Sequence, residues 1–149
     1  ILLLAARQHR HSRPRVDSHT ATSADHQGES IMSTPVCAIV GAGDGLGQAL
    51  ARRFAAEGMT LALLSRSESG SAAALAAANE TAPGGAHRYV QTDATQPEGL
   101  EAALNQVARD CGDIEVLIYN ARGGYQLRDP ITMSYDDLGE IYKLEVVGA

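Results

Sequence analysis

Residues 36–47 read VCAIVGAGDGLG, an apolar run followed by a loop that contains four glycines. The run Val36–Val40 suits a strand that is buried on both faces of a parallel sheet. Apolar residues then recur every four positions from Leu46 to Phe54, which predicts an amphipathic helix that stops at Gly58. A strand, a glycine loop and a helix in this order are typical of the first unit of a nucleotide-binding sheet.

The rest of the sequence repeats this alternation of strand and helix. Each unit takes about 30 residues, which predicts parallel βαβ connections with helices on both faces of the sheet. We therefore expect an α/β fold of the Rossmann type, a doubly wound parallel sheet that is incomplete because it has about four βα units. The further strands are predicted at 60–64, 87–90 and 114–118, and the further helices at 71–79, from Thr95 with Glu98 completing a capping box, and from Ser134 capped with Asp137.

The composition excludes several classes of protein. A chain of 149 residues has room for one domain, and no apolar run approaches the roughly 20 residues that cross a membrane. The net charge of −6 argues against a nucleic-acid partner and against binding to an anionic membrane. Cys37 and Cys111 are too few for a disulfide framework or a four-cysteine metal site. We expect intracellular thiols, a cytoplasmic location and no metal.

Two segments of the chain differ in composition. Residues 1–31 are rich in Ser, Thr, His and Arg and show no lasting apolar period, so we expect a disordered or non-native leader. The segment Met32-Ser-Thr-Pro directly precedes the first predicted strand and resembles a natural start. Residues 32–149 are the predicted nucleotide-binding domain. We expect this domain to be truncated at its C-terminal side, because a complete fold of this kind has two halves.

The glycines between the first strand and the first helix favour a phosphate-binding function. Without a Cβ, the backbone can turn sharply and come close to a phosphate. The N-terminus of the following helix offers unpaired N–H groups and a partial positive charge to a diphosphate. The alternative is a tight turn that binds no ligand.

The spacing G-x-x-x-G-L-G over residues 41–47 resembles the cofactor motif of the short-chain dehydrogenase/reductase family, with Val40 in place of the family's Thr. The resemblance extends from about Val36 to Ala149. It implies an oxidoreductase that transfers a hydride between a nicotinamide cofactor and a small carbonyl or alcohol substrate, in a parent protein that is a homo-oligomer. It also implies that cofactor contacts come from Gly41, Gly43, Asp44, Gly45, Leu46 and Gly47.

The residues after the second strand bear on the choice of cofactor. An acidic residue there binds the 2′-hydroxyl of the adenosine ribose, whereas a small residue followed by Arg accepts a 2′-phosphate. This chain has Ser65-Arg66, so we expect NADP, with NAD as the alternative. An ordinary solvated arginine is the other interpretation of Arg66.

The resemblance assigns two more pairs of residues to the cofactor. Asp93 matches the family's Asp that bonds the adenine amino group, and the N–H of Ala94 would bond a ring nitrogen. Asn120 and Ala121 match part of the family's N-N-A-G motif, whose Asn steadies the central sheet near the nicotinamide ribose. Capping of the following helix is an equal alternative for Asp93. Arg122 replaces a family glycine at this point, unless Gly123 or Gly124 takes over its place.

The family's catalytic Tyr-x-x-x-Lys pair is missing from this chain. Its only lysine is Lys143, and Gly139 stands four positions before it. We therefore expect no catalytic residue in this chain, and the chain alone to be inactive, while the parent protein is an enzyme. Glu145 stands where the family has a catalytic Asn. It would either join a proton relay or be a surface glutamate.

Two other functions fit parts of the sequence. The loop GAGDG at residues 41–45 also resembles that of methyltransferases that use S-adenosylmethionine, although Ser65-Arg66 fits their ribose site poorly. A non-catalytic nucleotide-binding module is the other alternative, suggested by Arg122 and Glu145.

Overall fold

The computed structural model describes residues 2–5, 34–122 and 131–147, and of residues 2–5 only the backbone. The leader segment 6–31, Gly123 and Gly124 therefore lie outside the described residues. The expectation of a disordered leader stays a prediction for residues 6–31.

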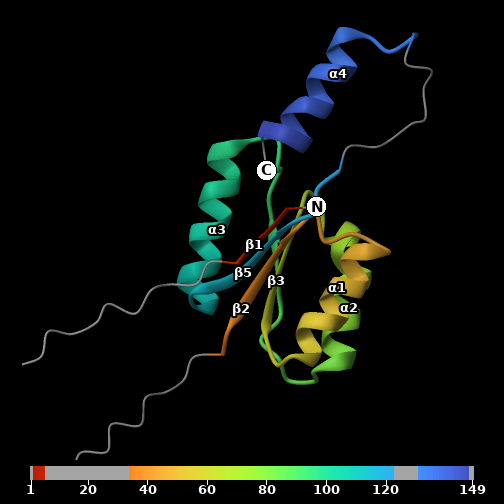
Figure 1. Cartoon of the computed structure of the whole chain (residues 1–149). Coiled ribbons are helices and arrows are strands. Elements are labelled where there is room, and N and C mark those ends of the chain that lie inside the picture. The colour runs from red at the N-terminus through yellow and green to blue at the C-terminus, as the bar shows by residue number, and fades with distance from the viewer. Residues whose placement is uncertain (1, 6–33, 123–130, 148–149) are drawn as a thin grey trace, which may run out of the picture.

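The centre of the molecule is a five-stranded sheet in the order β1-β5-β2-β3-β4 (Figure 1). β2, β3, β4 and β5 run parallel to one another, as the sequence predicts for a Rossmann-type sheet. The chain adds β3 and β4 on one side of β2 and then returns to place β5 on the other side. The strands are β1 (Leu2–Ala5), β2 (Val36–Val40), β3 (Thr60–Ser65), β4 (Arg88–Gln91) and β5 (Ile114–Tyr119).

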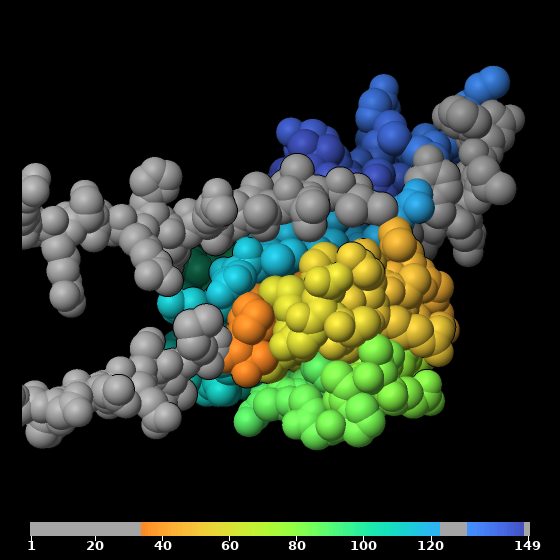
Figure 2. Space-filling view, turned by 60° about the horizontal axis from the view of Figure 1, so that its bottom comes forward, coloured from red at the N-terminus to blue at the C-terminus, as the bar shows by residue number. Residues whose placement is uncertain are grey.

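Helices cover both faces of the sheet, which confirms the doubly wound arrangement. α1 and α2 lie on one face and α3 lies on the other, while α4 stands beyond one end of the sheet (Figure 1). Seen from another side, the helical layer of α1 and α2 forms one continuous surface in yellow and green (Figure 2). The helices are α1 (Leu46–Ala56), α2 (Glu68–Thr81), α3 (Pro97–Cys111) and α4 (Tyr135–Tyr142), and a π-helical turn (Lys143–Val147) follows α4.

Alternating side chains of the strands build the two halves of the core. Ile39 and Leu63 face α1 and α2, whereas Val40 and Leu64 face α3, and all four are fully buried. Burial of a side chain of this size stabilises the fold by about 1.5–3 kcal/mol. None of the described helices is long and apolar enough to cross a membrane.

The starts of the helices follow local hydrogen bonds. α2 begins three residues earlier than predicted because the Ser67 hydroxyl accepts the N–H of Gly70 at 3.3 Å. The capping box predicted at Thr95 is wrong: α3 begins at Pro97, and Thr95 gives both its N–H and its hydroxyl proton to the Asp93 carboxylate. The nearer acceptor, Asp93, thus takes the Thr95 N–H that a capping box would give to the Glu98 carboxylate.

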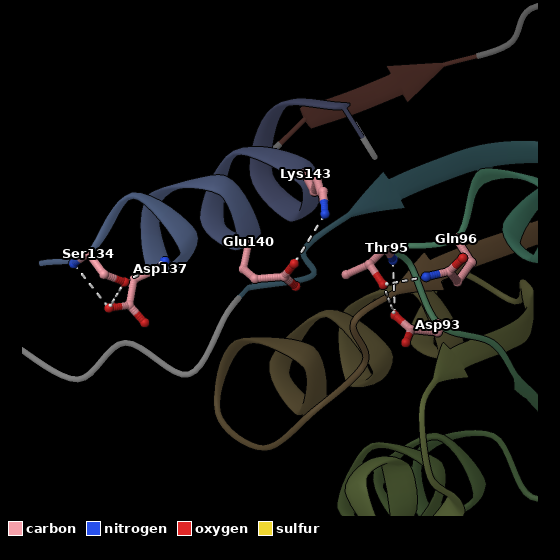
Figure 3. A network of polar contacts seen from close by, with 7 residues as sticks. All are labelled: Asp93, Thr95, Gln96, Ser134, Asp137, Glu140 and Lys143. Atoms are coloured by element: carbon pink, nitrogen blue, oxygen red, sulfur yellow. Dashed lines mark hydrogen bonds and ion pairs between the residues drawn. The ribbon is translucent and has the colours of Figure 1, made fainter.

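The start of α4 is as predicted. Ser134 Oγ accepts the Asp137 N–H at 3.1 Å, and the Asp137 carboxylate accepts the N–H of Ser134 at 3.2 Å (Figure 3). This reciprocal pair satisfies donors that the first turn of a helix leaves open.

The leader contributes a strand that the sequence analysis did not predict. Leu2–Ala5 forms β1 and pairs antiparallel with Val116–Tyr119 of β5. The expectation of a disordered leader is wrong for these four residues. An open sheet edge presents unpaired N–H and C=O groups, and an apolar segment in extended conformation satisfies them.

The half-buried imidazole of His87 leads us to expect a pH dependence of stability. Its Nδ1 accepts the N–H of Leu61 at 3.1 Å, and burial lowers the pKa of His87 below the ordinary 6.5. The fold favours the neutral ring, so its contribution is complete above pH 6.5 and is lost as the pH falls through 6.5 toward the lower folded pKa. We expect the free energy of unfolding to drop by about 1 kcal/mol, the worth of one hydrogen bond, in denaturant titrations between pH 7.5 and 5.

The control for this prediction is His87→Gln, whose side-chain oxygen keeps an acceptor but does not titrate. Stability of that variant should depend less on pH over the same interval. An unchanged pH dependence would contradict the assignment to His87.

Candidate functional site

A cleft of about 470 Å³ opens at the carboxyl ends of the four parallel strands. It lies where the order of the strands reverses between β2 and β5, which is the usual ligand site of open α/β sheets. Ten of the twelve residues expected from the sequence line it: Gly41, Gly43, Asp44, Leu46, Ser65, Arg66, Asp93, Ala94, Asn120 and Ala121.

Gly41 is the point where the first loop meets the loop after β5. Its φ is +81°, a region that favours glycine, and a Cβ there would lie 2.5 Å from the backbone of Ala121. The side-chain amide of Asn120 donates to the Gly41 carbonyl at 3.1 Å, and the Asn120 N–H donates to the Val40 carbonyl at 2.8 Å. The two loops are therefore locked together at the floor of the cleft.

Gly45 and Gly47 do not line the cleft, but both shape it. Gly45 has a φ of +72° and is the N-cap residue of α1. A Cβ on Gly47 would lie 2.8 Å from the backbone of Ala42, so this glycine lets α1 pack directly on the loop. Their place in the cofactor motif is explained by backbone geometry.

The N-terminus of α1 is suited to an anion. No side chain among the described residues caps it, and its first turn contains no acidic residue. The helix dipole therefore acts on the cleft with its positive end. Leu46 is 44% exposed at this point, an unusual position for a large apolar side chain, and it lines the cleft.

The Ser65 hydroxyl forms hydrogen bonds within the protein. Its hydroxyl donates to the Ser67 carbonyl at 2.8 Å and lies 2.7 Å from the Ser71 hydroxyl, which is 1% exposed. Ser65 thus shapes the loop between β3 and α2. The adjoining Arg66 side chain is exposed at the rim of the cleft.

Asp93 holds the turn before α3 and also faces the cleft. The N–H and the hydroxyl of Thr95 donate to Asp93 Oδ1 at 3.0 and 2.8 Å (Figure 3). These two hydrogen bonds, and to a smaller extent the charge of Arg66, lower the pKa of Asp93 below its ordinary value. Asp93 therefore holds the turn before α3 without capping the helix itself, and its carboxylate remains ionised at neutral pH.

Several residues of the cleft were not predicted from the sequence. Thr92 is 7% exposed, and its hydroxyl has no hydrogen-bond partner among the described residues. Because Thr92 directly precedes Asp93 in the sequence, its place at the cleft could have been predicted. Leu144 lines the cleft from the π-helical turn, and no pattern in the sequence predicts that turn. The other missed residues are Val40, Leu64, Ser67, Gly70, Thr95 and Arg122.

Glu145 lies beside Tyr119 and not on an open surface. Glu145 is half-buried, and its Oε1 is buried without a hydrogen-bond partner among the described residues. The Tyr119 hydroxyl donates to the Leu144 carbonyl at 2.6 Å. Burial, with smaller contributions from the charges of Asp93 and Glu145, raises the pKa of Tyr119 above its ordinary value. The phenol therefore stays protonated at neutral pH.

Comparisons with known proteins agree with this geometry. The chain is 33% identical over 113 residues to meso-2,3-butanediol dehydrogenase of Serratia marcescens, covering 76% of this chain and 43% of that protein. It is 31% identical over 114 residues to glucose 1-dehydrogenase of Gluconobacter oxydans, covering 74% of this chain and 41% of that protein. The crystal structure of levodione reductase superposes with a TM-score of 0.71 at 29% identity, covering 76% of this chain and 44% of that one.

The chain spans less than half the length of these relatives. The family described as short chain dehydrogenase matches residues 35–149, which include every strand and helix described above except β1. With its glycine loop, its doubly wound sheet and its cleft at the switch point, the chain belongs to the short-chain dehydrogenase family.

Proposed function

We propose that this chain is the cofactor-binding portion of an NADP-preferring oxidoreductase that transfers a hydride between nicotinamide and a small carbonyl or alcohol substrate. The observation that carries the proposal is the cleft itself, where the glycine loop, the N-terminus of α1 and Arg66 meet. The N-terminus of α1 and the guanidinium of Arg66 offer positive charge at two places in the cleft, which fits a ligand that carries phosphates at two positions.

The residues of the cleft fit a dinucleotide. Its diphosphate would lie against the N-terminus of α1, where glycine leaves the backbone accessible. The adenine end would lie between Arg66 and Asp93, whose ionised carboxylate accepts a hydrogen bond from an amino group. The nicotinamide end would lie toward Asn120 and Ala121. The family's cofactor supplies the hydride, and these residues bind and orient it.

Arg66 supports NADP over NAD. It follows directly on β3, the strand whose end meets the adenosine ribose in folds of this class. A guanidinium there attracts a 2′-phosphate, whereas binding of an unmodified ribose is improved by an acidic residue. This position carries no acidic side chain.

The chain's own chemistry is limited to binding in this proposal. The Tyr-x-x-x-Lys pair that resemblance to the family predicts is not in the sequence, so this part of the protein would bind coenzyme without turnover. We further place the protein in the cytoplasm, because Cys37 and Cys111 are both free thiols.

Titration of the 149-residue chain with NADPH and NADH, followed by coenzyme fluorescence, tests the proposal. We expect NADPH to bind at least about tenfold more tightly than NADH, since an added charged contact contributes about 1.5–3 kcal/mol. S-adenosylmethionine should not bind. Failure to bind either coenzyme would overturn the proposal, and binding of S-adenosylmethionine would favour the methyltransferase alternative.

A further inference from the structure

The backbone of the loop that carries Arg66 is held by strand β4. The Ser65 carbonyl accepts two hydrogen bonds, from the Tyr89 hydroxyl at 3.1 Å and from the Thr92 N–H at 3.0 Å. The next carbonyl, that of Arg66, accepts the side-chain amide of Gln91 at 3.1 Å. Neither Tyr89 nor Gln91 lines the cleft.

The loss of one of these hydrogen bonds affects the Ser65 and Arg66 carbonyls differently. Two donors hold the Ser65 carbonyl, so the loss of one leaves the other in place. The Gln91 amide is the donor to the Arg66 carbonyl. This peptide carries Arg66 itself and leads into Ser67, the N-cap of α2. A change at Gln91 therefore acts on the direction in which the Arg66 side chain leaves the backbone.

We propose that Gln91 is a positioning residue that sets the choice between NADPH and NADH by fixing the peptide after Arg66. The inference rests on the proposed function, because it needs Arg66 to meet the 2′-phosphate. Gln91 touches no coenzyme atom in this account. Its effect reaches the ligand through the Arg66 backbone, so affinity for the 2′-phosphorylated coenzyme should change while affinity for NADH stays the same.

Gln91→Met keeps the length of the side chain and removes the donor. We expect the ratio of NADPH to NADH affinity to fall about fivefold, the effect of one hydrogen bond on the position of a charged group. Gln91→Glu should lower the ratio further, because its carboxylate repels both the Arg66 carbonyl and a bound phosphate. Tyr89→Phe is the matched control. It also removes a hydrogen bond from β4 to this loop but leaves the Ser65 carbonyl bonded to Thr92, and we expect its ratio to stay within about twofold of the unmodified chain.

The affinity ratio separates positioning from a general structural role, because a destabilised fold weakens both coenzymes together. Thermal unfolding of each variant checks that the chain is folded. If Gln91→Met and Gln91→Glu keep the ratio of the unmodified chain while Arg66→Ser lowers it, the inference is wrong and the proposed function stands. An unmodified chain that binds NADPH and NADH equally well would overturn the proposed preference for NADP and this inference with it.

Discussion

Replacement of Gly41 by alanine is expected to abolish coenzyme binding and to destabilise the fold by about 3 kcal/mol. The positive φ of +81° costs an alanine about 1–2 kcal/mol, and overpacking against neighbouring atoms adds about 1–3 kcal/mol. The added Cβ would lie 2.5 Å from two backbone atoms of Ala121, which cannot rotate away as a side chain can. Chemical denaturation and titration with NADPH measure the two effects.

Gly58→Ala is the matched control for this prediction. Gly58 also has a positive φ, +78°, but no described atom lies within 4 Å of the position of its Cβ, and it does not line the cleft. We expect a loss of about 1–2 kcal/mol for its backbone conformation and an unchanged affinity for NADPH. Equal losses of stability in the two variants would show that the close contact of the added Cβ at position 41 with the Ala121 backbone does not destabilise the fold.

The sequence predicts those parts of the fold that have a local cause. The parallel strands follow from short apolar runs, and Ser134 and Asp137 are close enough in sequence to reveal their capping box. The predicted start of α3 was wrong because Asp93 accepts the Thr95 N–H in place of Glu98, and spacing alone does not decide between two acceptors. β1 was missed because its partner, β5, lies more than a hundred residues later in the sequence.

The same distinction holds for the candidate site. Residues at the carboxyl ends of predicted strands, such as Arg66 and Asp93, line the cleft as expected, because parallel strands end at one edge of the sheet. Ser65 lines it too, but its hydroxyl bonds within the loop, and only the three-dimensional structure shows that. Leu144 depends on a π-helical turn after α4, which has no signal in the apolar pattern.

Replacement of Arg66 by serine is expected to have the largest effect on the choice of coenzyme. Loss of a charged contact with the 2′-phosphate should weaken NADPH binding about 10- to 100-fold, while NADH binding stays within about twofold. Arg66→Lys keeps the charge but not the planar fork of donors, so we expect an intermediate loss. Titrations at two salt concentrations add a second criterion. The preference for NADPH should shrink as ionic strength rises, because Arg66 is exposed and its charge is screened.

The matched control is Arg53→Ser. Arg53 is an exposed arginine on α1 that pairs with Glu57 at 2.6 Å and does not line the cleft. The variant changes the net charge of the chain by the same amount as Arg66→Ser, so it shows how much net charge alone affects the binding of a phosphorylated ligand. If both variants weaken NADPH binding to the same extent, the general charge of the protein explains the preference. If Arg66→Ser leaves NADPH binding unchanged, Arg66 is an ordinary solvated side chain. A loss confined to Arg66→Ser assigns the effect to the cleft, because Arg53 carries the same charge but does not line the cleft.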